Sequence, residues 1–212
     1  MNISIIGTGR MGRSLTKRFV TAGLDVILGV RNYENNDKLQ EISKKQSGDI
    51  KISPVAEAIQ AGEIVIFATW FTVTQELVVE FQKQLADKII IDISNPFAPD
   101  MKGFLTDFDS SAAEEIVGKA EGLRVVKAFN TNFSGALWEG AVAGRPLDVF
   151  VASDDEEARS TILEVVAQLG LRGVDAGPLA SARTLERMVL LQAGTMGRMK
   201  LSPVTAFGLL TQ

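Results

Sequence analysis

Six residues near the start of the chain have the types and the spacing that hold a pyrophosphate. The short apolar run 3–6 leads directly into Gly7-Thr8-Gly9-Arg10-Met11-Gly12, and a helix-like pattern follows. Gly7 would make the tight turn, Gly9 would let backbone N–H groups approach the phosphates, and Gly12 would let the helix pack against its strand. Unpaired N–H groups at a helix N-terminus favour an anion. We therefore predict that this six-residue loop binds a dinucleotide.

Arg31 follows the second expected strand, about twenty residues beyond the glycines, where dinucleotide sites read the adenosine ribose. An arginine there accommodates the extra phosphate of NADP, whereas an acidic residue binds the ribose hydroxyls of NAD. Arg31 and Asn32 have no carboxylate beside them, so we predict that they bind the phosphate of NADP. Glu34 and Asp37 come a few residues later, which leaves NAD open as an alternative.

Polar and aromatic residues end two later apolar runs. Ala68-Thr69-Trp70 closes the run 64–68, and Asn95 follows the run 89–93. Ligands of open α/β sheets bind at the carboxyl ends of the strands, so we expect Ala68, Thr69, Trp70 and Asn95 beside the nicotinamide half of the cofactor. Two plainer interpretations stay open, because an aromatic residue such as Trp70 can belong to the core and Asn95 can simply begin a turn.

The run 125–129 ends in two more polar residues. Strand alternation sends Lys127 to one face and Asn130 to the other. A lysine that reaches solvent is favoured here over a catalytic ammonium group. We predict instead that Asn130 and the following Thr131 contact the second substrate.

Asp175-Ala176-Gly177-Pro178-Leu179-Ala180 is expected to form a rigid turn. Exposed backbone amides around Gly177 and Leu179 could then bind the edge of a heterocycle, so Pro178 and Leu179 are further candidate substrate contacts. A C-terminal helical pattern follows, with apolar residues at Leu185, Met188, Leu191 and Met196. This spacing indicates packing within one subunit or the interface of a homodimer.

The composition excludes several classes of function. The 212 residues carry a formal net charge of −4, with no histidine and no cysteine. Scattered Lys and Arg residues form no basic stripe, so we expect neither a nucleic acid nor a membrane as partner. The first strand begins almost at once, which leaves no room for a signal peptide, and no apolar run is long enough to span a bilayer. Together with the absence of cysteine, this favours a cytoplasmic location.

The absence of histidine narrows the chemistry further. It removes the commonest general acid or base, the Ser-His-Asp triad and most catalytic metal sites. We therefore expect no metal site and no catalytic side chain, with a bound cofactor as the carrier of the chemistry.

Short β-branched runs alternate with helical patterns, as in a parallel sheet with crossover helices. The expected strands are 3–6, 25–30, 64–68, 89–93, 125–129 and 149–152. We predict an α/β fold with a doubly wound, mostly parallel, Rossmann-like sheet, helices on both faces and a C-terminal helical segment. Ser53-Pro54 is expected to start a helix, Ser153 and Glu156 to form a capping box, and 95–110 to be a loop.

These residues resemble the coenzyme F-420-dependent NADP oxidoreductase family across most of the chain. The segments that carry the resemblance are the loop 7–12, Arg31, 68–70, 111–114, 125–131 and 175–179. The resemblance implies a single domain over 1–212 that holds NADP along the sheet edge, with the acceptor side formed by about 124–212. It also implies a deazaflavin against the nicotinamide, near Asn130 and Pro178-Leu179, and direct hydride transfer between the rings.

The sequence departs from that family at two places. Members that use the deazaflavin tend to have histidine where Asn130 stands and serine where Val30 stands. The run 125–130 is similar to the cytosolic reductase domain of six-transmembrane metalloreductases, which pass hydride from NADPH to a flavin. We therefore predict an NADPH-dependent oxidoreductase with a flavin, a deazaflavin or a quinone-like small molecule as acceptor. A non-catalytic NADP(H)-sensing module is the alternative, and a hydroxyacid or imine dehydrogenase fits less well because those families add a large helical domain.

Overall fold

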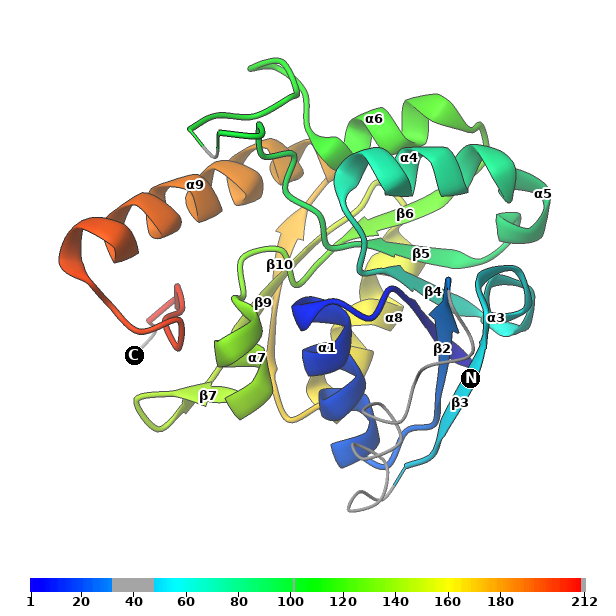
Figure 1. Cartoon of the computed structure of the whole chain (residues 1–212), viewed down its shortest axis with the longest axis horizontal. Helices are drawn as coiled ribbons and strands as arrows, with labels where there is room; N and C mark the ends of the chain where they lie inside the picture. Colours follow the sequence, from blue (N-terminus) through cyan, green and yellow to red (C-terminus); the bar gives the residue numbers. More distant parts are fainter. Residues whose placement is uncertain (32–47, 101, 211–212) are drawn as a thin grey trace.

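A mostly parallel sheet runs through the centre of the protein (Figure 1). The computed structural model describes residues 1–31, 48–100 and 102–210. Within them the sheet has eight strands in the order β10-β9-β6-β5-β4-β1-β2-β3. The strands are β1 (Ile3–Ile6), β2 (Val26–Val30), β3 (Ile50–Pro54), β4 (Ile64–Phe67), β5 (Ile89–Asp92), β6 (Arg124–Lys127), β9 (Asp148–Ala152) and β10 (Arg172–Gly177).

The directions of the strands confirm the doubly wound arrangement. Neighbours from β3 to β6 are all parallel, with β1 between β2 and β4. β9 meets β6 in antiparallel fashion where Ala152 pairs with Lys127, and β10 is parallel to β9. Strands β3 and β10 had no predicted counterpart. The segment 175–177, expected as part of a turn, completes β10 instead.

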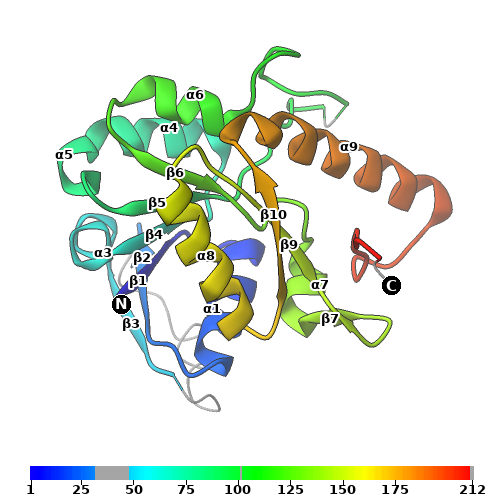
Figure 2. The ribbon, with the colours of Figure 1, turned by 180° about the vertical axis from the view of Figure 1, so that it is seen from behind.

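Helices cover both faces of the sheet (Figures 1 and 2). α1 (Arg10–Thr21), α7 (Ser134–Glu139) and α8 (Glu156–Gln168) bury apolar residues in one hydrophobic core. α3 (Val55–Ala61), α4 (Phe71–Glu80), α5 (Gln82–Leu85) and α6 (Ala112–Lys119) build the second core on the other face. The strands β1, β4 and β5 are buried along their whole length, which explains why all their residues except Ser4 and Asp92 are apolar.

The C-terminal helix α9 (Ala182–Met199) follows the short 3₁₀ helix η1 (Leu179–Ser181). Figure 1 shows that α9 starts beside α6 and extends away from the sheet. Leu185 is buried, whereas the side chain of Leu191 is 60% exposed, so the apolar residues of this helix do not all share one buried face. A two-stranded ribbon, β7 (Ala141–Val142) with β8 (Arg145–Pro146), lies outside the main sheet.

Two predicted helix starts were wrong. Ser53 and Pro54 belong to β3, and α3 begins one residue later, at Val55. Ser153 does not cap α8: its buried hydroxyl donates to the carbonyl of Val125 in β6 at 2.7 Å and accepts the N–H of Asp155 at 3.2 Å, which lies before the helix. Asp155 takes the capping role and accepts the Ala158 N–H at 2.9 Å. Serine is a favoured N-cap residue, but here each serine is used by the sheet. The backbone of Ser53 is part of β3, and the side chain of Ser153 is bonded to β6.

The segment between β5 and α6 is irregular, as predicted for residues 95–110. An isolated β-bridge joins Phe97 to Phe104, whose rings meet edge to face with their centres 5.4 Å apart. No helix in the described part of the chain is both long enough and apolar enough to cross a membrane.

Candidate functional site

The loop between β1 and α1 has two glycines that the backbone requires and one that leaves space open. Gly7 has a φ of +112°, which side chains rarely adopt, and a Cβ there would lie 2.6 Å from the carbonyl oxygen of Ala68. A Cβ on Gly12 would lie 2.0 Å from the carbonyl oxygen of Gly7. A Cβ on Gly9 would meet no atom within 4 Å. Gly7 and Gly12 therefore shape the loop, while Gly9 leaves its surface accessible.

The loop 7–12 leads into the N-terminus of α1, which carries the partial positive charge of the helix dipole. Gly9 is the N-cap residue and has no side chain to cap the helix, and the first turn contains no acidic residue. Arg13 donates the first intrahelical bond, to the carbonyl of Gly9 at 3.0 Å. The N–H groups before it have no intrahelical acceptor, and together with the helix dipole they favour a bound anion.

The strand order brings most of the predicted residues to one edge of the sheet. Arg31 follows β2, the loop 7–12 follows β1, 68–70 follows β4, Asn95 lies beyond β5, and Asn130 lies beyond β6. Because these strands are parallel and adjacent in the order β2-β1-β4-β5-β6, their carboxyl ends form one row. Asn32 lies outside the described residues, as do Glu34 and Asp37.

Backbone bonds tie neighbouring members of this row together. The N–H of Gly7 donates to Gly29 in β2 at 3.1 Å, and the N–H of Ala68 donates to Ile6 in β1 at 2.8 Å. The Gly7 turn is thereby held between the ends of β2 and β4.

Trp70 and Phe71 have different environments. The Trp70 side chain is 71% exposed at the N-cap of α4, whereas that of Phe71 is 5% exposed in the second core. Thr69 lies between Ala68 and Trp70, and its hydroxyl shares a hydrogen bond of 2.7 Å with the hydroxyl of Thr74. Phe71 is therefore the core residue of the aromatic pair, and Trp70 leaves a ring face free at the edge of the sheet.

Asn95 and Asn130 join the ends of β5 and β6. The Asn130 amide donates to Oδ1 of Asn95 at 3.0 Å, and the Asn95 amide donates to the carbonyl of Asn130 at 3.1 Å. Phe129 bends the chain before this pair, with a φ of +60° in the left-handed region that is costly for a bulky residue. The Asn130 side chain is 4% exposed, and its Oδ1 has no hydrogen-bond partner among the described residues. Thr131 is buried next to it.

A buried ionic cluster lies beneath this pair. The Lys127 ammonium in β6 donates to Oδ2 of Asp92 at 2.7 Å, to Oε1 of Glu186 at 2.6 Å and to the carbonyl of Ser94 at 2.6 Å. The other Asp92 oxygen accepts the Ser94 N–H at 2.9 Å. Glu186 of α9 accepts the Ala112 N–H at the start of α6. The cluster thus joins β5, β6, α6 and α9.

The prediction that Lys127 reaches solvent was wrong. Its side chain is 0% exposed because β6 is covered by helices on both faces. Burial by itself would lower the pKa of Lys127, but the carboxylates of Asp92 and Glu186 outweigh it and raise the pKa. Burial also raises the pKa of Glu186, against the opposing charge of Lys127. Lys127 is therefore held as a cation at neutral pH.

Sequence reasoning missed Asp92 and Glu186. One signal was available: a lysine in a strand that is buried on both faces needs carboxylate partners. Asp92, at the end of the apolar strand β5, is the partner that this argument could have found. Glu186 lies 59 residues from Lys127 in the chain, so residue spacing could not reveal their contact.

The segment around Gly177 differs from the expectation of exposed amides. The Gly177 N–H donates to Asp175 at 2.8 Å, and the Leu179 N–H donates to Asp154 at 2.9 Å. The Leu179 side chain is buried in the second core, while Pro178 is exposed. β9 and β10 run against β6, so this turn does not belong to the row of parallel strand ends. Its amides serve the protein's own packing.

Comparisons with known proteins agree with this architecture. The family model described as "NADP oxidoreductase coenzyme F420-dependent" matches residues 2–96. The F420-dependent NADP reductase of Methanothermobacter marburgensis is 29% identical over 205 residues, which cover 90% of each chain. Metalloreductase STEAP3 of Rattus norvegicus is 31% identical over 192 residues, which cover 89% of this chain and 36% of the relative. The chain therefore spans about a third of that metalloreductase.

A solved structure has the same fold. A crystal structure from Arthrobacter sp. FB24, described as that of a candidate F420-dependent NADP reductase, superposes with a TM-score of 0.81 at 23% identity. The match covers 94% of this chain and 95% of that one. These findings confirm the resemblance and the fold class that were predicted from the sequence.

Proposed function

We propose that this chain, which is similar to F420-dependent NADP reductases over most of its length, is an oxidoreductase that transfers hydride between NADPH and a flavin or deazaflavin. We propose further that residues 1–212 act as one NAD(P)-binding domain, because both hydrophobic cores are built on the same sheet. α9 carries charged residues as well as apolar ones, and its exposed Leu191 is compatible with a homodimer.

The observation that carries the proposal is the order of residues along the sheet edge. From β2 to β6 the row runs from an arginine, through an uncapped helix N-terminus, to an exposed tryptophan and an asparagine pair. An extended dinucleotide presents the same sequence of groups, from ribose phosphate through pyrophosphate to nicotinamide. The acceptor ring would then bind beyond the nicotinamide, near β6.

The phosphate end of the cofactor is assigned to two groups. The N–H groups of the loop 7–12 would bind the pyrophosphate, because Gly9 leaves room for its approach. Arg31, which is exposed after β2, would pair with the phosphate on the adenosine ribose. Asn32 stays a prediction for the same phosphate.

The reactive end is assigned to the groups after β4, β5 and β6. Thr69, Trp70 and Asn95 would border the nicotinamide, with the free ring face of Trp70 against a planar group. Asn130 and Thr131 would limit the acceptor side. The nicotinamide and the acceptor ring supply the chemistry, and the protein supplies their alignment at about 3–3.5 Å. No side chain needs to move a proton, which fits a chain without histidine.

Pro178 and Leu179 have a supporting role in this proposal. The Leu179 amide bonds η1 to Asp154, and the Gly177 amide is taken up by Asp175, so neither amide is free for a ligand. We therefore assign the acceptor contacts to Asn130 and Thr131.

The experiment is a pair of measurements on the purified protein. Binding of NADPH is first measured by fluorescence titration, and NADPH absorbance is then followed with coenzyme F420, FMN, FAD and a soluble quinone in turn. Oxidation with a flavin or deazaflavin, and none with the quinone, is the expected result. If the protein binds NADPH but no acceptor oxidises it, the proposed enzymatic function is wrong and a redox-sensing module is supported. If the protein does not bind NADPH, both functions are wrong.

A further inference from the structure

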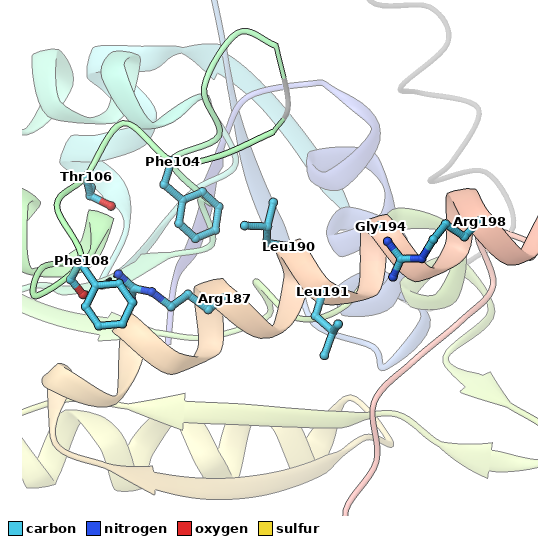
Figure 3. A pocket seen from close by; sticks show the side chains of 8 residues that line it. All are labelled: Phe104, Thr106, Phe108, Arg187, Leu190, Leu191, Gly194 and Arg198. Atoms are coloured by element: carbon cyan, nitrogen blue, oxygen red, sulfur yellow. Dashed lines mark hydrogen bonds between the residues drawn. The ribbon is translucent and has the colours of Figure 1, made fainter.

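A pocket of about 580 Å³ lies between the loop 95–110 and α9 (Figure 3). Its volume is in the range of small-molecule sites. Phe104, Thr106 and Phe108 line it from the loop, and Arg187, Leu190 and Arg198 line it from α9. In Figure 3 the ring of Phe104 points toward Leu190, and Phe108 lies over Arg187. None of the residues assigned above to NADPH or to hydride transfer lines this pocket.

The pocket contains two cations without a carboxylate partner. Arg187 donates to the carbonyls of Arg183, Asp107 and Phe108, and Arg198 donates to the hydroxyl of Thr195. Among the described residues neither arginine takes part in an ion pair, although the neighbouring Arg183 is paired with Glu114. Both guanidinium charges therefore remain available to an anion.

The acidic residues nearby do not neutralise these charges. Asp107 and Asp109 belong to the same loop, but neither lines the pocket. The pKa of Arg183 is raised by its hydrogen bond to Glu114 and, to a smaller extent, by the charge of Asp109.

Aromatic faces and one hydroxyl complete the lining. The Phe108 side chain is 85% exposed, and the Arg187 guanidinium lies 4.4 Å from its ring centre. This cation–π contact and the bonds from Arg187 to the loop hold the phenyl ring in place over the pocket. The Thr106 hydroxyl oxygen is buried and has no hydrogen-bond partner among the described residues. A ligand that offers a planar ring and a hydrogen-bonding group would satisfy both features.

We propose that this pocket binds a planar aromatic ring that carries an anionic group, either a phosphate or a carboxylate. The ring packs against Phe104, Phe108 and Leu190, and the anion pairs with Arg198, which lies about three helical turns beyond Arg187 on α9. The ligand is either the anionic part of the acceptor itself or a separate ring-bearing anion. The proposal goes beyond hydride transfer, because the pocket can bind such a ligand whether or not the protein oxidises NADPH.

FMN and riboflavin provide the matched probes, because they share one ring system and only FMN carries a phosphate. Their binding to the full-length protein is measured by the change in flavin fluorescence. We expect the protein to bind FMN about tenfold more tightly than riboflavin, as one charge-assisted contact allows. Higher salt should reduce this preference, because the charges are close to solvent.

Arg198→Ala is the decisive variant. Its side chain is exposed near the end of α9, so its removal should leave the fold intact, which circular dichroism verifies. We expect FMN affinity to fall to that of riboflavin. Arg145→Ala, which removes an exposed arginine on the separate β7–β8 ribbon, should keep the wild-type preference. Phe108→Ala should weaken both flavins, because it removes ring contact and leaves the Arg198 charge.

The outcomes separate the sources of the ligand and can reject the site. If NADPH is oxidised and Arg198→Ala raises the KM for FMN at constant kcat, the pocket holds the acceptor's anionic part. If FMN binding is lost while the KM is unchanged, the pocket holds a separate ligand. Equal affinity of the wild-type protein for FMN and riboflavin, or an Arg198→Ala variant that behaves like Arg145→Ala, would overturn the proposal independently of the hydride-transfer result.

Discussion

The ammonium nitrogen of Lys127 lies 2.6 Å from Oε1 of Glu186, and this buried contact joins the central sheet to the C-terminal helix. Glu186 also accepts the N–H of Ala112 at the start of α6, so one carboxylate connects two helices and a strand. The same lysine holds the carbonyl of Ser94, directly before Asn95 at the proposed nicotinamide site. The cluster therefore anchors the start of α9, the helix that forms one wall of the pocket in Figure 3.

Lys127→Met should strongly destabilise the protein. The substitution leaves Asp92 and Glu186 close together in the interior without the cation that balances them, and breaking a buried ion pair in this way costs about 3–5 kcal/mol. Urea unfolding followed by circular dichroism measures the loss. Lys51→Met, at an exposed position of β3, is the control and should change stability by at most about 0.5 kcal/mol. Similar losses in the two variants would contradict the structural role of the cluster.

Glu186→Gln should change the pH dependence of stability in a defined direction. Burial raises the pKa of Glu186 above its ordinary value of 4.5, so the folded state binds this proton more tightly than the unfolded state. The contribution of Glu186 is therefore complete below pH 4.5 and declines as the pH rises through the raised pKa. The free energy of unfolding of the wild type, minus that of the variant, should decline with it.

The measurement for Glu186 is urea unfolding at several pH values from the mildly acidic to the neutral range. Glu80→Gln on the exposed side of α4 serves as the control and should follow the wild-type curve. A wild-type minus Glu186→Gln difference that is constant with pH, or that grows toward neutral pH, would reject the expected direction.

Gly12→Ala and Gly9→Ala should separate folding from cofactor binding. A Cβ on Gly12 would collide with the Gly7 carbonyl, so this variant should lose about 1–3 kcal/mol of stability and bind NADPH poorly. A Cβ on Gly9 has free space within the protein and should cost at most about 1 kcal/mol, as at a helix N-cap. It should nevertheless weaken NADPH roughly tenfold, because it occupies the approach of the pyrophosphate. Unchanged NADPH affinity in a folded Gly9→Ala variant would refute this phosphate site.

Arg31→Ala should weaken NADPH much more than NADH. A charge-assisted contact to the ribose phosphate is worth about 1.5–3 kcal/mol, which corresponds to a roughly 10- to 160-fold loss of NADPH affinity. NADH lacks that phosphate and should be affected by less than about threefold. Calorimetric titration with both nucleotides gives the ratio directly. Equal losses for the two nucleotides would remove the phosphate contact from the proposal.

The local signals in the sequence were sufficient for most of the fold. Continuous apolar runs such as Ile64–Phe67 predicted buried parallel strands, and the glycine spacing at 7–12 predicted the turn between β1 and α1. β3 was missed because Ile50–Pro54 contains a lysine and a proline at the sheet edge, where neither requires burial. The segment 175–177 was taken as part of a turn, because its glycine and aspartate outweighed the short apolar signal before them.

What the amino-acid order specified was local: which segments form strands and helices, and which glycines can turn tightly or allow close approach. The contacts of Lys127 were decided by the tertiary structure, because a strand covered on both faces cannot send a lysine to solvent and must supply it with carboxylates. The tertiary structure also bound the amide of Leu179 to Asp154 and brought two arginines of α9 and two phenyl rings of the loop 95–110 into the lining of one pocket. These outcomes depend on residues far apart in the chain, whose approach is set by sheet order and helix packing rather than by spacing.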